Sequence, residues 1–401
     1  MSEPVKFRIP NARQSQPYSG AIAPAPGEPP VILLDVVPAP DLALTCELAT
    51  GQLSGTPQAH GDFSISVHYR LLGEGADTRH QATATMYVNP DPRQLWRDIP
   101  SDRDAPHWKP DQAVQMLAGG ERRIIAARTR GRSHAHVGSC CDDDFFVHAD
   151  PSDAWYIAIV ADGAGSAALS RLGSQLSVQA AGNHLRQLLG GAEGRQVLAA
   201  VAALQADEST RSRQMLHEAL VATVGAAARQ AMQALSDAAR DAPGGIQSVR
   251  DLATTLLIGV ARKCGEAWLC AAYWVGDGVV GVYREGFAPV LLGDVDGGEY
   301  AGQTRFLDPS EVSHEALEKR IRHVLCDDFT AFMLMTDGVS DPRFETVAQL
   351  SLAEPWRALW NEIGQAVRPF DADAQAGQRL LEWLGFWSQG NHDDRTIAMI
   401  C

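Results

Sequence analysis

The sequence predicts an α+β protein in which a small all-β domain precedes a larger mixed domain. Residues 63–69 alternate apolar and polar side chains, the two-residue period of a half-buried strand. Residues 165–241 are instead rich in the helix formers alanine, leucine, glutamine and arginine. Beyond them, strand-like and helix-like stretches fall in blocks without strict alternation. This order favours α+β over a doubly wound parallel sheet.

Composition divides the chain into four parts. Residues 1–30 are rich in proline and polar residues, which predicts a flexible or extended arm. Residues 31–90 carry short strand-like runs separated by Gly, Pro and Asp, as in a small β-sandwich. Residues 91–120 contain four prolines and are expected to be a linker with one short helix. The second domain is expected over residues 121–401.

The stretch 49–57, followed by an alternating strand, resembles an immunoglobulin-like repeat of bacterial surface proteins. Such repeats are usually adhesive or spacing elements. The same glycines and proline are what any pair of tight turns requires, so an unrelated β-module remains an alternative.

The second domain is expected to contain both helices and strands, in the following order. Two or three helices fit in 165–241; strands follow at 254–261, 267–275, 279–283 and 332–335; helices follow near 353–366 and 373–385; and a last strand covers 396–400.

Charge and cysteine content exclude several classes of function. The chain of 401 residues has a formal net charge of -15, which disfavours nucleic acid and anionic membranes as partners. The 7 cysteines form no CxxC pair, and residues 1–10 lack an apolar stretch, so a cytoplasmic protein with reduced thiols is expected. There is no GxxxxGK[ST] loop for a kinase or ATPase and no Cys-x5-Arg loop of a cysteine phosphatase.

Aspartates recur where apolar runs of the second domain end or begin. Each is also explained by a plain turn or a solvated loop, most readily Asp277-Gly278, which stands between two apolar runs as a hairpin would. Five such places in one domain are harder to explain in this way. Carboxylates gathered at one sheet edge repel unless divalent cations bind, and an all-oxygen ligand set suits magnesium, manganese or calcium. The places are Asp142-Asp143-Asp144, Asp162-Gly163, Asp277-Gly278, Asp337-Gly338 with Asp341, and Asp393-Asp394.

The order and flanking residues of these motifs resemble the metal-dependent protein phosphatases (the PPM family, also called type 2C). The similarity is greatest to the compact bacterial branch, in which a His-rich stretch precedes the first aspartates. It extends over residues 121–401 and implies a four-layer α-β-β-α sandwich with two central antiparallel sheets. The matching stretches are 133–145, 160–166, 251–257, 275–278, 334–341 and 393–396.

The resemblance implies a site for two Mn²⁺ or Mg²⁺ ions that share a bridging water. Asp162 matches the aspartate that contacts both metals, and Gly163 the glycine whose carbonyl binds one. Asp337 and Asp393 match two further metal-binding carboxylates. The cations lower the pKa of the shared water, and the resulting hydroxide attacks phosphorus in line with the leaving serine or threonine oxygen.

The resemblance also covers the opening acidic residues and a weaker third metal. Asp143 matches the aspartate that holds metal-bound water, and Asp142 its acidic neighbour. Three aspartates in a row leave this register open by one, so Asp144 is an alternative. Asp277 and Asp341 match positions that hold a third metal in some members.

The sequence departs from the family at the residue that grips the substrate phosphate. Many members carry arginine four residues before the acidic pair, where this chain has Gly138. His134 and His136 are candidates for a phosphate ligand or a general acid; the alternative is that both are strand residues on an exposed edge. Three arginines are further candidates for the missing cation, with a solvated strand as the alternative: Arg128, Arg130 and Arg132.

Two other features are expected to be less important. Asp394 stands where many members have asparagine, which keeps an acceptor but adds a charge. Thr254 and Thr255 are expected to pack in the sheet rather than to act in catalysis.

The sequence therefore predicts a metal-dependent serine/threonine protein phosphatase of bacterial signalling. Its partners would be a phosphorylated protein and, by family analogy, a Ser/Thr kinase and the targets of that kinase. The alternatives are a catalytically silent phosphatase-fold binding module, which the missing arginine supports, and a hydrolase of small phosphate esters.

Overall fold

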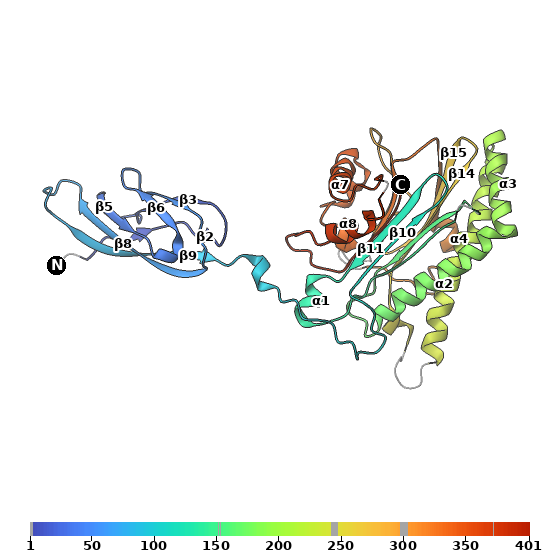
Figure 1. Cartoon of the computed structure of the whole chain (residues 1–401), viewed down its shortest axis with the longest axis horizontal. Helices are drawn as coiled ribbons and strands as arrows, with labels where there is room; N and C mark the ends of the chain where they lie inside the picture. Colours follow the sequence, from blue (N-terminus) through green and yellow to red (C-terminus); the bar gives the residue numbers. More distant parts are fainter. Residues whose placement is uncertain (1–2, 151, 153, 242–247, 297–303, 372) are drawn as a thin grey trace. The chain divides into compact units, whose positions relative to one another are not determined.

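The computed structural model of the chain consists of two compact units, residues 1–97 and 98–401 (Figure 1). It describes residues 3–150, 152, 154–241, 248–296, 304–371 and 373–401. Among these residues, no helix has both the length and the apolar character needed to cross a membrane.

The described elements of the first unit are strands and short 3-10 helices. A four-stranded sheet has the order β2-β9-β8-β5, a three-stranded sheet the order β3-β7-β6, and β1 pairs with β4. Side chains such as Leu53, Ile65 and Met86 fill the core of the unit. The strands are β1 (Phe7–Arg8), β2 (Ala12–Arg13), β3 (Tyr18–Ala21), β4 (Ala23–Pro24), β5 (Val31–Val37), β6 (Leu44–Glu47), β7 (Gln52–Gly55), β8 (Gly61–Leu71) and β9 (His80–Asn89); the 3-10 helices are Pro40–Leu42 and Pro92–Leu95.

The prediction of a flexible arm over residues 1–30 is wrong. Four short strands lie in this stretch, and Ile9, Ala12 and Ile22 are buried in the core of the unit. Since each strand has only two to four residues, no periodic pattern marks it, and the prolines between strands dominate the composition. The β-domain thus begins well before residue 31.

The second unit contains two antiparallel sheets. One has six strands in the order β10-β11-β20-β19-β16-β17, and the other has five in the order β12-β13-β14-β15-β18. Its strands are β10 (Gln112–Ala118), β11 (Arg123–Thr129), β12 (Asp144–Ala149), β13 (Tyr156–Ala161), β14 (Leu256–Cys264), β15 (Ala267–Val275), β16 (Val279–Tyr283), β17 (Val290–Leu291), β18 (Ile321–Cys326), β19 (Ala331–Met335) and β20 (Arg395–Ile400). The predicted α+β class is therefore confirmed.

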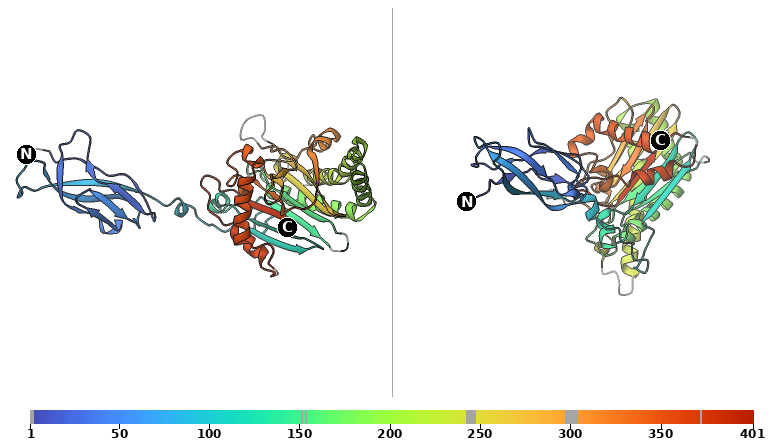
Figure 2. Two further views of the ribbon diagram at one scale, coloured as in Figure 1. Left: turned by 90° about the horizontal axis from the view of Figure 1, so that it is seen from above. Right: turned by 60° about the vertical axis from the view of Figure 1, so that its left-hand side comes forward.

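Eight helices are described in this unit, and three long ones pack on the five-stranded sheet (Figures 1 and 2). They are α1 (Arg132–Val137), α2 (Ser170–Gly190), α3 (Ala192–Ala206), α4 (Thr210–Asp241), α5 (His314–Arg320), α6 (Asp337–Ser340), α7 (Ala353–Ala366) and α8 (Ala376–Trp383); the 3-10 helices are Val249–Leu252 and Val347–Ser351.

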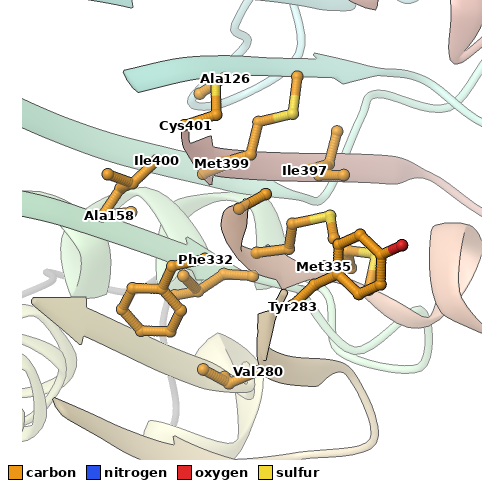
Figure 3. Close-up of a cluster of buried hydrophobic side chains, with 14 of the residues drawn as sticks. Ala126, Ala158, Val280, Tyr283, Phe332, Met335, Ile397, Met399, Ile400 and Cys401 are labelled. Atoms are coloured by element: carbon orange, nitrogen blue, oxygen red, sulfur yellow. The ribbon is translucent and has the colours of Figure 1, made fainter. Parts of the chain in front are cut away.

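Two hydrophobic cores hold the layers together. Along β13, Ile157 and Ile159 point into a core with α2, α3 and α4, whereas Ala158 and Val160 point into a second core. The second core joins the two sheets and also takes in side chains of α7 and α8; Figure 3 shows part of it, with Ala158 near Phe332. Because β13 is covered on both faces, its sequence is apolar without alternation.

The prediction of a linker over residues 91–120 is also wrong. Residues 112–118 form β10, an edge strand that pairs with β11 over its whole length. Its burial pattern is mostly exposed or half-buried, since it is covered on one face only. Residues 98–111 belong to the second unit as well.

Candidate metal centre

The predicted aspartates lie where strands of the two sheets end. Asp162 follows β13, Asp337 follows β19, and Asp393 precedes β20. Asp277 lies between β15 and β16, which belong to different sheets, so the alternative of a hairpin turn at this position is wrong. The crossing from one sheet to the other brings Asp277 to the same edge as the other carboxylates.

The centre is a cluster of carboxylates in which negative charge exceeds positive charge. Carboxylate oxygens of Asp162, Asp277 and Asp337 lie within 4.8 Å of one another. The Oδ1 atoms of Asp143, Asp277 and Asp337 are buried and have no hydrogen-bond partner. Buried carboxylate oxygens without donors are costly, and an all-oxygen set of this kind suits a hard divalent cation. The residues present therefore fit Mg²⁺ or Mn²⁺.

The pKa values of these carboxyl groups also show that their negative charges are not compensated. Burial, together with the charges of Asp143 and Asp337, raises the pKa of Asp162 well above its ordinary range. Burial and the neighbouring carboxylates act in the same direction on the pKa of Asp337. Burial and the charge of Asp394 raise the pKa of Asp143 to about 7. Bound cations would remove the reason for these shifts.

Two threonines hold Asp162 by its backbone. The hydroxyl of Thr254 donates to the carbonyl of Asp162 at 2.9 Å, and the hydroxyl of Thr255 accepts from the amide of Asp162 at 2.9 Å. Thr255 also donates its own N–H to that carbonyl at 2.8 Å. The two threonines, expected only to pack in the sheet, thus also fix the first aspartate of the cluster.

Gly163 occupies a position with no room for a side chain. A Cβ atom there would lie 2.8 Å from the carbonyl oxygen of Asp142 and 2.8 Å from Ser170. Gly163 also forms an isolated antiparallel bridge with Thr254. The close approach of three chain segments at this point accounts for the glycine after Asp162.

Asp277 is held by one hydrogen bond and follows a glycine whose conformation other residues rarely adopt. The hydroxyl of Thr304 donates to its Oδ2, which leaves Oδ1 without a partner. Gly276 has φ +123°, and a Cβ there would lie 2.6 Å from Thr255. Asp341, just after α6, is exposed as a residue, but partial desolvation of its carboxyl group and the charge of Asp277 raise its pKa to about 6.

The structure distinguishes the members of the triple aspartate. Asp143 is fully buried, and its Oδ2 accepts from the hydroxyl of Thr336 at 2.9 Å while its Oδ1 has no partner. Asp144 instead forms ion pairs with Arg128 at 3.3 Å and Lys109 at 3.1 Å. A carboxylate already paired with two cations is a poor metal ligand, so the geometry favours Asp143 over Asp144. Asp142 lies next to them and is almost fully buried.

His134 lies on helix α1 rather than on a strand. Its Nδ1 is 2.9 Å from Oδ2 of Asp394, and its Nε2 is 3.9 Å from Oδ2 of Asp142. Burial alone would lower the pKa of His134, but the hydrogen bond and charge of Asp394 outweigh this and raise it to about 9. Asp394 also accepts from the amides of Gly131 at 2.6 Å and Asp142 at 2.5 Å. The charge that Asp394 adds is therefore matched by a cationic imidazole.

The other candidates for the missing cation have contacts elsewhere. Arg130 pairs with Asp98 at 3.0 Å and Asp111 at 3.4 Å, and Arg132 donates to the carbonyl of Gly385 at 2.9 Å. Arg128 is paired with Asp144 as described above. His136 is half-buried two residues beyond His134 and is in neither of the carboxylate groups found among the described residues. His134 is in contact with Asp394, as described above.

Two residues of this centre were missed at the sequence level. Thr336 is recognisable afterwards as the polar residue that ends an apolar strand just before Asp337. Lys109 lies 34 residues before Asp143 in a stretch without periodicity, so no local pattern marks it.

The family model described as Protein phosphatase 2C matches residues 130–385. The chain belongs to the protein phosphatase 2C family. Membership implies a metal-dependent phosphatase that acts on serine or threonine in phosphoproteins. The matched range includes the aspartates from Asp142 to Asp341 and ends before Asp393 and Asp394. No curated protein matches this chain at a significant level.

Several solved structures are similar to this member of the family. They include the catalytic domain of the serine/threonine phosphatase PstP with two manganese ions (18% identity, 70% of this chain and 97% of that chain, TM-score 0.36). RsbX in complex with magnesium (14%, 72% and 98%, 0.36) and a phosphatase from Toxoplasma gondii (12%, 72% and 95%, 0.46) are further examples.

Proposed function

We propose that the chain hydrolyses phosphoserine and phosphothreonine in proteins and that it uses two divalent cations, Mn²⁺ or Mg²⁺. The cations would be held by Asp143, Asp162, Asp337 and Asp393, with the carbonyl of Gly163 as a further ligand. The observation that carries this proposal is the set of buried carboxylate oxygens without hydrogen-bond donors in Asp143, Asp277 and Asp337. No hydrophobic or hydrogen-bonding role explains three such atoms at one sheet edge.

Bound cations of this kind lower the pKa of water and offset the charge on a phosphoryl group. The protein's own residues would orient the reactants. His134, held by Asp394 at 2.9 Å, would present a positive imidazole to the substrate phosphate or donate a proton to the leaving oxygen. This role would replace the arginine that is absent at Gly138. His136, two residues further along α1, would be a secondary candidate for the same role.

Asp277 and Asp341 would hold a weaker third cation. Asp277 has one oxygen bonded to Thr304 and one without a partner, and Asp341 is exposed. An exposed ligand next to a buried one supports a site that exchanges its metal more readily than the others.

The proposal also includes the expected arrangement of the two domains and the expected cellular role. The two sheets with their covering helices would be the four-layer arrangement of the family, and the β-domain expected over residues 31–90 would be an immunoglobulin-like module. The substrate would be a phosphoprotein in a cytoplasmic signalling system, with a Ser/Thr kinase as the opposing enzyme.

The test is hydrolysis of a phosphothreonine peptide by the full chain with Mn²⁺ and with EDTA. Turnover should require Mn²⁺ and should be abolished in Asp162→Asn and Asp337→Asn. Asp237→Asn on α4, where the half-buried Asp237 pairs with Arg240 at 2.8 Å, serves as the matched control and should behave like the wild type in this assay. A chain that binds Mn²⁺ tightly but does not turn over any phosphopeptide would contradict the proposal and favour a binding module. Hydrolysis of small esters alone would favour the phosphate-ester alternative.

A further inference from the structure

The segment that joins the two units packs against the metal centre. Residues 98–111 lead from the end of the first unit to β10. Ile99 donates its N–H to the carbonyl of Ala135 at 2.9 Å, and the guanidinium of Arg171 donates to the carbonyl of Pro106 at 2.8 Å. Lys109, near the end of the segment, is only 4% exposed. The segment is thus part of the packed structure of the second unit.

Lys109 directs its ammonium group at the triple aspartate. Its Nζ lies 2.6 Å from the carbonyl oxygen of Asp143 and 3.1 Å from Oδ2 of Asp144. It also donates to Oγ of Ser174 and to the carbonyl of Arg171, both at 3.3 Å. Burial of an ammonium group is costly unless several acceptors surround it, and these four supply what is needed.

The backbone of the acidic stretch is held at three successive points. Asp394 accepts from the N–H of Asp142 at 2.5 Å, and Ser174 donates to the carbonyl of Asp142 at 2.5 Å. Lys109 then holds the carbonyl of Asp143. The backbone on both sides of the Asp143 side chain is thus fixed, and Thr336 is bonded to its Oδ2. Together these contacts restrict the orientation of the carboxylate, whose Oδ1 has no hydrogen-bond partner.

A purely structural role, neutralisation of Asp144, explains the contacts of Lys109 less well. Arg128 already pairs with Asp144 at 3.3 Å. The shortest contact of Lys109 is to the carbonyl of Asp143, one residue nearer the cluster. The ammonium group therefore acts on the position of Asp143 as well as on the charge of Asp144.

We propose that Lys109 is a positioning residue of the metal centre, which fixes Asp143 through its carbonyl and makes the connecting segment part of the phosphatase site. This inference rests on the proposed function, because it takes Asp143 as a residue of the metal centre. Residues that orient metal-binding groups typically contribute roughly ten- to a hundred-fold to metal affinity or activity.

The experiment compares the full-length wild type with Lys109→Met and Lys109→Arg. Lys263→Met, which removes an exposed lysine paired with Glu121 at 2.7 Å, is the matched control. Calorimetry measures the Mn²⁺ dissociation constant, and hydrolysis of a phosphothreonine peptide at saturating Mn²⁺ measures kcat and KM. Lys109→Met should weaken Mn²⁺ binding roughly ten-fold or more and lower kcat with little change in KM. Lys109→Arg should restore part of both, and the control should match the wild type.

Wild-type Mn²⁺ affinity and kcat in a folded Lys109→Met variant would overturn the inference. If that variant does not fold, Lys109→Arg decides, because it keeps the charge but changes the contact with the carbonyl of Asp143; wild-type Mn²⁺ affinity and kcat in it would overturn the inference. If the wild type binds Mn²⁺ but does not hydrolyse phosphopeptide, the proposed function fails, while the Mn²⁺ affinities of the variants still decide the role of Lys109. A wild type that binds no Mn²⁺ contradicts both.

Discussion

The metal-free chain should become more stable as the pH falls from about 7 to about 5, opposite to the usual behaviour of carboxylates in ion pairs. In the folded chain, burial and nearby charges raise the pKa of Asp142 to about 6 and that of Asp143 to about 7. Both groups have ordinary values near 3.8. Between these limits the folded state binds more protons than the unfolded state, so stability is gained as the pH falls through the folded pKa values and lost as it rises.

The size of this effect follows from the number of protons taken up. One proton bound on folding changes the free energy of unfolding by about 1.4 kcal/mol per pH unit, and two protons by about 2.7 kcal/mol. Asp142 and Asp143 together should therefore contribute a slope between these values near pH 6, and the raised pKa values of Asp162, Asp337 and Asp341 should make the total slope steeper. With saturating Mn²⁺ the slope from these carboxyl groups should disappear, because the cations keep them ionised in the folded state and they are ionised in the unfolded state as well.

The assay is urea unfolding followed by circular dichroism at several pH values, once with EDTA and once with Mn²⁺. Asp143→Asn should flatten the slope measured with EDTA, whereas Asp237→Asn should leave it unchanged. A metal-free stability that is flat or that rises with pH over this window would refute the reasoning, since the carboxylates would then already be compensated in the absence of metal.

Three further substitutions test the surroundings of the centre. Asp394→Asn should lower the pKa of His134 toward its ordinary value, because the hydrogen-bonded charge is lost; NMR titration of the imidazole measures this, and an unchanged value would contradict the pairing. Thr336→Val should weaken Mn²⁺ binding and cost about 1–3 kcal/mol in urea unfolding, because the buried N–H of Thr396 loses its acceptor; unchanged values in both measurements would rule this role out. Gly276→Ala should destabilise the fold by roughly 1–3 kcal/mol, from its φ of +123° and the contact with Thr255, and a wild-type melting temperature would argue against strain at this glycine.

The sequence allowed the strand-end aspartates to be predicted because their signal is local. An apolar run followed by Asp-Gly marks a strand and its end within a few residues, as at Asp162 and Asp337. The strands Ala267–Val275 and Val279–Tyr283 were predicted with their exact bounds for the same reason. Which sheet each strand joins is not a local property, so the crossing at Asp277 was not predictable from its flanking residues.

The features that sequence reasoning missed depend on distant partners. Strand β2 has two residues and pairs with β9 through Ala12 and Val88. No local sequence pattern of either strand indicates this pairing. The pairing of His134 with Asp394 spans 260 residues. The only hint of this pairing in the sequence is the extra charge of Asp394, which needs a cationic partner. Several histidines and arginines of the sequence could be that partner. The position of Lys109 is even less predictable, because two of its four acceptors are backbone carbonyls, which any residue type could supply.

The central claim, that the aspartate cluster is a divalent cation site built around Asp162, is tested most directly by counting bound manganese. Electron paramagnetic resonance of free Mn²⁺ in a titration gives the number of ions bound tightly by the full chain. The account predicts two tightly bound ions in the wild type, the same two in Asp341→Asn, and none in Asp162→Asn with the fold retained by circular dichroism. Tight Mn²⁺ binding that persists undiminished in Asp162→Asn would contradict the account.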